Sequence, residues 1–184
     1  RPAAWAAGAL LLAGAWAALS VRQTGIWKDS ESLWARALAL QPRHSTALRH
    51  LGVLRFKQGR PEEALGFIDA ALEARPIGDA FALRGALLLA LGRAAEAREA
   101  LERATALPLE VAPAGAWIHL SAALRAERRY AEAARAAARA RRIAPEDARA
   151  SLELALALEQ SGDRDGAALE YRGALKRPPG AGQA

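Results

Sequence analysis

The chain has 184 residues and a formal net charge of +6, and it contains no Cys, which excludes disulfide bonds and metal sites built from thiolates. Ala, Leu, Arg and Glu favour helices and dominate the composition, while β-branched residues are scarce, so we expect an all-α fold. The positive charge is compatible with anionic lipid, nucleic acid or acidic protein and does not select one of them.

The first predicted element is an apolar helix. Residues 3–21 are 19 residues without a charge, which would span about 28 Å as a helix, close to the hydrocarbon core of a bilayer. We therefore predict a transmembrane helix within residues 1–24. Two alternatives stay open, namely the core of a signal peptide and a helix buried against protein that precedes Arg1. The chain contains no Met, so we expect it to be a piece of a longer protein.

The remaining chain divides into segments that end near a proline. Gly59 and Gly92 are 33 residues apart, and so are Ala64 and Ala97. The glycines predict turns between two helices within a segment. We expect a second helix alone in 25–42, helix pairs in 43–76, 77–108, 109–145 and 146–178, and a disordered tail in 179–184.

Small residues recur at the depth where the two helices of a segment would meet. Antiparallel helices approach closely only where their side chains are small. The positions expected at these contacts are Gly52, Gly85, Ser121 and Ala155 on the first helices, and Ala64, Ala97, Ala133 and Ala167 at the start of the second helices.

This pattern, with a period near 34 residues, resembles the tetratricopeptide repeat (TPR) family. The resemblance implies a TPR-type α-solenoid of antiparallel helix pairs. It also implies that partners bind along a concave groove lined by the first helices.

Three features depart from the family pattern. Arg84 occupies a position where a large apolar residue is usual, and Arg128 replaces the turn glycine. The connection over residues 107–115 is longer than its counterparts, and its prolines keep it out of a helix. We expect a local irregularity of the solenoid at this connection.

The repeat register extends backwards into the N-terminal region. Gly25 falls on the turn position and Trp34 on a large apolar position, which makes residues 29–40 a second helix. Its partner would be the apolar helix, so the predicted membrane span is expected to pack on the first repeat. The junction, through Arg22, Trp27, Leu33, Trp34 and Pro42, resembles polytopic glycosyltransferase-like proteins that carry TPRs, such as the eukaryotic transmembrane O-mannosyltransferases and their bacterial relatives.

That second resemblance implies a location for the repeats. In such proteins the repeats would face the periplasm or another extracytoplasmic space, and the catalytic carboxylates would lie upstream of this chain. The cations that follow the apolar run, Arg22, Lys28 and Arg36, favour the opposite, cytoplasmic orientation. Both orientations stay open, and the first is preferred.

The groove that the register predicts is basic at its first repeat and apolar after it, which suits a peptide or protein partner with apolar side chains. The chaperone-tail type of this family holds a terminal carboxylate with basic residues and Asn, and this chain contains no Asn. The candidate groove residues are Arg49, Val53, Phe56, Lys57, Leu89, Ile118, Ala122, Arg125, Leu152 and Leu156.

A run of arginines in residues 125–142 forms a candidate basic patch. It could engage phosphates or anionic head groups, but a solvated helix surface is the preferred interpretation. Only one aromatic residue lies within the run, so we expect no specific binding of nucleic acid. The patch consists of Arg125, Arg128, Arg129, Arg135, Arg139, Arg141 and Arg142.

The sequence contains no catalytic constellation. His44, His50 and His119 are not spaced as metal ligands on one helix, and we expect structural or groove-lining roles for them. Asp163 and Asp165 imitate part of a calcium loop, but Arg172 stands where a bidentate Glu is required, so a helix start is the better interpretation. We expect no metal, no cofactor and no enzymatic activity in this chain.

These observations favour a membrane-tethered TPR module for protein–protein contact. One alternative is the acceptor-binding region of a membrane glycosyltransferase, and another is a free-standing soluble or secreted TPR scaffold. The sequence leaves the oligomeric state open.

Overall fold

The computed structural model describes residues 30–106 and 113–176, and all regular secondary structure within them is helical. The helices are α2 (Ser30–Leu40), α3 (Ser45–Lys57), α4 (Pro61–Ala74), α5 (Gly78–Ala90), α6 (Ala94–Thr105), α7 (Ala114–Ala126), α8 (Tyr130–Ile143), α9 (Ala148–Ser161) and α10 (Arg164–Leu175).

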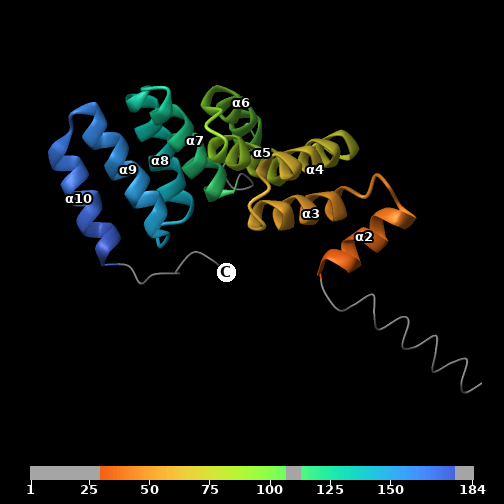
Figure 1. The fold of residues 1–184 in the computed structure, drawn as a ribbon. Helices are drawn as coiled ribbons and strands as arrows, with labels where there is room; N and C mark the ends of the chain where they lie inside the picture. Colours follow the sequence, from red (N-terminus) through yellow and green to blue (C-terminus); the bar gives the residue numbers. More distant parts are fainter. Residues whose placement is uncertain (1–29, 107–112, 177–184) are drawn as a thin grey trace, which may run out of the picture.

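The helices pack as hairpins that are stacked along an arc (Figure 1). The pairs α3 with α4, α5 with α6, α7 with α8 and α9 with α10 have the most extensive contacts of the fold. The first helices α5, α7 and α9 also contact one another in turn, whereas the described second helices make no comparable contacts among themselves. The first helices therefore form the inner layer of the arc, which confirms the predicted solenoid.

The hairpin turns share one backbone conformation. Gly59, Gly92 and Gly162 have positive φ, and so does Arg128, with φ of 62°. In each turn an N–H bonds to a carbonyl five residues earlier, as in Arg93 N to Leu88 O at 2.8 Å and Arg129 N to Leu124 O at the same distance. This bond is typical of a helix that ends in a Schellman motif. Arg128 thus adopts the left-handed backbone conformation that glycine adopts in the other three turns.

Replacing Arg128 by glycine is therefore expected to stabilise the chain. A side chain at positive φ costs about 1–2 kcal/mol, and the greater freedom of glycine in the unfolded chain offsets part of the gain. The free energy of unfolding in urea should rise by about 1 kcal/mol. Arg129→Gly is the control, because Arg129 has φ of −87° and should gain nothing. Equal effects of the two substitutions would contradict this explanation of the turn.

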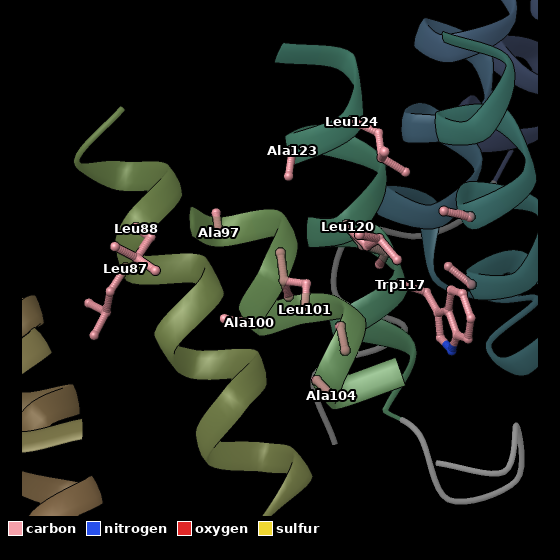
Figure 2. Close-up of a cluster of buried hydrophobic side chains, with 14 of the residues drawn as sticks. Leu87, Leu88, Ala97, Ala100, Leu101, Ala104, Trp117, Leu120, Ala123 and Leu124 are labelled. Atoms are coloured by element: carbon pink, nitrogen blue, oxygen red, sulfur yellow. The ribbon is translucent and has the colours of Figure 1, made fainter. Parts of the chain in front are cut away.

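The small residues that were predicted at the helix contacts lie in the core. Ala64, Ala97 and Ala133 are completely buried where each second helix begins. Leu101 of α6 is also completely buried, and a Cβ atom added to Gly85 of α5 would come within 2.8 Å of both its Cδ atoms. Figure 2 shows Leu101 and its neighbours filling the space between α5, α6 and α7. Glycine at this depth is what allows α5 and α6 to approach.

One junction of the inner layer differs from the others. The helices on either side of the long connection, α5 and α7, still contact each other, while α3 and α5 lack a comparable contact. Arg84 of α5 bonds to Asp69 of α4 at 2.7 Å, so a polar pair occupies part of this junction in place of an apolar side chain. Burying a guanidinium is costly unless it is paired, and the bond to Asp69 supplies that partner. Most of the connection over 107–115 lies outside the described residues, so the irregularity expected there stays a prediction.

Helix α2 packs on α3 as the predicted half repeat. The Trp34 indole stacks on the His50 imidazole with ring centroids 4.3 Å apart, and Arg55 pairs with Glu31 at 2.7 Å. The predicted membrane span in 1–24 lies outside the described residues. Within 30–106 and 113–176, no helix combines the length and the apolar character that a bilayer crossing requires.

Candidate functional site

The inner face is defined here as the exposed side of the first helices α3, α5, α7 and α9. Phe56 at 41% and Leu152 at 44% relative exposure are large apolar side chains left open to solvent near its two ends. Single exposed apolar side chains are common on protein surfaces, so these two count as candidate contacts only together with the charges beside them. Of the other predicted apolar groove residues, Val53, Leu89, Ala122 and Leu156 are half-buried.

Ile118 does not belong to this face. Only 6% of its surface is exposed, and it packs in the core with Leu120 and Leu124. Its helix, α7, contacts both α5 and α9. The prediction of Ile118 as a groove residue was therefore wrong, because the register gave its position on the helix but not how closely the next helix would approach.

The cations of the inner face fall into two groups. Arg49 and Lys57 of α3 form no ion pair with any described carboxylate. Arg125 of α7 instead bonds to Glu153 at 2.9 Å and to Gln160 at 3.0 Å, both on α9. The first repeat thus keeps free positive charge, while the charge at the third repeat is neutralised within the fold.

The predicted basic patch is not one surface. Arg125 lies on the inner face, Arg128 forms a turn, Arg129 pairs with Glu132 at 2.7 Å, and Arg141 pairs with Glu170 of α10 at 3.1 Å. Acidic partners divide the seven arginines, and two of these partners, Glu153 and Glu170, lie on other helices, where the linear run does not reveal them. The members that remain without a carboxylate on the exposed face of α8 are Arg135, Arg139 and Arg142.

Arg84 lines a hollow on the surface of the chain. It has a volume of about 550 Å³ and lies on the outer side where α4, α5 and α6 meet. The Arg103 guanidinium sits 5.8 Å from the centre of the Phe81 ring at its wall. The sequence marked Arg84 as unusual but gave no sign of the space beside it.

The histidines and the acidic helix starts have structural roles. His44 accepts a bond from the Ala47 N–H at 3.1 Å as the cap of α3. Burial and the nearby Arg49 lower the pKa of His50, and burial and Arg149 lower the pKa of His119, so both imidazoles are neutral at pH 7. In the part of the chain that the structure describes, no group of three or more His, Asp and Glu side chains could hold a metal ion.

Asp163 and Asp147 are helix caps, and the sequence predicted the helix start at Asp163. Asp163 accepts the Gly166 N–H at 2.9 Å, so the interpretation as a helix start is confirmed in preference to a calcium loop. Asp147 accepts the Arg149 N–H at 2.9 Å, and its hydrogen bond to the Arg149 guanidinium lowers the pKa of its carboxyl. The stability from this cap is present above the ordinary pKa of Asp and is lost as the pH falls through the lowered value.

Family models and solved structures agree with this architecture. A tetratricopeptide repeat model matches residues 17–79 and 119–182, and a second one matches residues 78–109. A structure of MamA is similar with a TM-score of 0.70 and 24% identity, covering 84% of this chain and 90% of MamA. YrrB, described as a TPR protein with an unusual peptide-binding site, is similar with a TM-score of 0.66 and 23% identity, covering 82% of this chain and 77% of YrrB.

A further similar structure contains a bound peptide. The first TPR of Spaghetti (RPAP3), bound to the HSP90 peptide SRMEEVD, has a TM-score of 0.60 and 24% identity, and covers 64% of this chain and 95% of that one. At these identities the likeness establishes the fold. No curated protein matches the chain.

Proposed function

Because the chain belongs to the tetratricopeptide repeat family, we propose that it is a protein–protein interaction module whose inner face binds a peptide with apolar and acidic side chains. The observation that carries this proposal is the pairing of exposed Phe56 with unpaired Arg49 and Lys57 on one side of α3. Two structures of similar fold, one described with a peptide-binding site and one bound to a peptide, support a peptide as the class of partner.

The spacing on α3 supports one continuous contact. Arg49, Val53, Phe56 and Lys57 are separated by four, three and one residues, which places them along one stripe of a helix. Burying the exposed part of Phe56 under a partner side chain is worth about 1 kcal/mol or more. The two cations at the ends of the stripe would hold carboxylates of the same peptide through charge-assisted hydrogen bonds.

Selection of peptides is the test of this function. A displayed random-peptide library is panned against residues 1–184. Sequences that combine apolar residues with Asp or Glu should be enriched, because they complement the stripe on α3. Enrichment of basic peptides, or no enrichment over a surface without protein, would contradict the proposal.

The uncharged residues 3–21 support a membrane tether for this module. We expect the full chain to partition into the detergent phase of a cloud-point extraction and residues 25–184 to stay in the aqueous phase, since only the former carries the 19-residue apolar run. The same partition for both forms would contradict the tether and favour a free-standing TPR scaffold. The preferred location of the repeats is extracytoplasmic.

The second candidate function is the acceptor-binding region of a membrane glycosyltransferase. The junction residues Trp34 and Pro42, within the resemblance described above, favour it. In this case the chain upstream of Arg1 would hold many further membrane spans and an early acidic motif. A short basic start in that place would favour an anchored scaffold.

A further inference from the structure

Three arginines form a cationic stripe on α8, away from the inner face. Arg135, Arg139 and Arg142 are separated by four and three residues and are all exposed, and none pairs with a described carboxylate. Over seven residues the stripe is about 10 Å long. We propose that this outer face of α8 is a second binding site, which takes phosphate groups.

Arg139 is held in position before any ligand binds. Its guanidinium carbon lies 4.8 Å from the centre of the Trp117 ring, and Trp117 is fixed in the core with 6% of its surface exposed. A stacked guanidinium keeps its N–H groups free at the edge of the plane, where they match the oxygens of a phosphate. Less conformational freedom is then lost on binding than for an unrestrained surface arginine.

A hollow beside the stripe provides the space. It has a volume of about 470 Å³ and is lined by Ala138, Arg139, Arg141, Arg142 and Pro145. Small-molecule sites are typically about 300–1,000 Å³. Arg141 is engaged with Glu170 at 3.1 Å, so Arg139 and Arg142 supply the free charge.

A second hollow of about 160 Å³ adjoins the first and shares Arg139. Arg135 lines it together with Glu102 and Glu132. These carboxylates are compensated, because Glu102 pairs with Arg98 at 2.8 Å and Glu132 with Arg129 at 2.7 Å. The stripe therefore keeps its positive charge in spite of its acidic neighbours.

The chemistry favours phosphate over other anions. A phosphate carries up to two charges and three acceptor oxygens, which two or three guanidinium groups can share. Nucleic acid fits less well, since no aromatic side chain that the structure describes on α8 is exposed for base stacking. The phosphate group could come from a soluble phosphate ester or from a lipid head group.

Inorganic phosphate is the first probe. It is added to the ¹⁵N-labelled full chain at constant ionic strength, with chloride as the balancing salt. The arginine Nε–H signals of Arg139 and Arg142 should shift saturably. In the Arg139→Gln/Arg142→Gln variant, phosphate should bind about tenfold more weakly or worse, as expected for two lost charge-assisted bonds.

Two further variants keep the result interpretable. Arg36→Gln/Arg43→Gln removes the same charge from exposed arginines near α2 and should bind phosphate as the wild type does. Arg142→Gln alone leaves the contact of Arg139 with Trp117 intact, so its weakened binding cannot be attributed to a loosened core. Unchanged affinity in both α8 variants, or equal shifts with chloride alone, would overturn the proposal.

Vesicles distinguish the two sources of phosphate. The wild type and the α8 double variant are sedimented with phosphatidylcholine vesicles, with and without phosphatidylglycerol at about one lipid in four. Binding that needs phosphatidylglycerol and is lost in the double variant identifies lipid head groups as the source. If phosphate binds saturably but vesicle binding does not depend on phosphatidylglycerol, the source of the phosphate group is a soluble ester. The absence of both effects would overturn the proposal.

Discussion

Substituting Gly85 by alanine should destabilise the chain by about 1–3 kcal/mol, although alanine is the better helix former. The added Cβ would lie 2.7 Å and 2.8 Å from the Cδ atoms of Leu101 and closer still to its Cγ. Leu101 is completely buried and cannot move aside without displacing α6. Urea denaturation followed by circular dichroism measures the change in the free energy of unfolding.

Gly66→Ala is the matched control. Gly66 lies within α4, and a Cβ added there meets nothing within 4 Å. The same substitution should therefore stabilise the chain by about 0.5–1 kcal/mol. A loss of stability for Gly85→Ala with a gain for Gly66→Ala would show that the close approach of Leu101, and not helix propensity, explains the glycine at position 85.

The Leu101→Ala background tests the contact itself. That substitution alone should cost about 2–5 kcal/mol through the cavity it leaves. With the Leu101 side chain truncated, Gly85→Ala should become neutral or stabilising, because its Cβ enters free space. The same cost of Gly85→Ala in both backgrounds would show that Leu101 is not the reason for the glycine.

The Arg49→Glu/Phe56→Glu variant should lose binding of the selected peptides by about thirtyfold or more, as for a lost hot spot. The first change reverses the charge of an unpaired cation, and the second places a carboxylate where an apolar side chain would be buried. Neither side chain is in the core, so the free energy of unfolding should change little. Fluorescence anisotropy of a labelled peptide measures the dissociation constant.

Arg164→Glu/Leu169→Glu is the control for this variant. It makes the same two changes on α10, where Arg164 is exposed and Leu169 is 68% exposed. Its peptide affinity should equal that of the wild type at the same ionic strength. Equal losses in the two variants would point to net charge rather than to the inner face.

The sequence predicted the hairpins because each turn and each close contact depends on one position. Gly59, Gly92 and Gly162 have the positive φ that their placement in the repeat implied, and Ala64 and Ala97 are completely buried. What it could not predict was how hairpins fit against each other. The repeat pattern predicted neither the missing contact between α3 and α5 nor the bond from Arg84 to Asp69 at the same junction.

The candidate site was predicted less well, for a related reason. Whether Ile118 faces solvent depends on the approach of the neighbouring helices, and whether Arg125 is free depends on Glu153, 28 residues away. The stack of Trp34 on His50 likewise joins two helices whose pairing only the fold reveals. Residues whose role is local were predictable, and residues whose role depends on a partner in another repeat were not.

Mapping a selected peptide on the full chain by amide chemical shifts tests most directly that the inner face binds the partner. The account predicts shifts concentrated on α3 around Arg49 and Phe56 and continuing along the exposed sides of α5, α7 and α9. Shifts confined to the second helices α4, α6, α8 and α10 would contradict it.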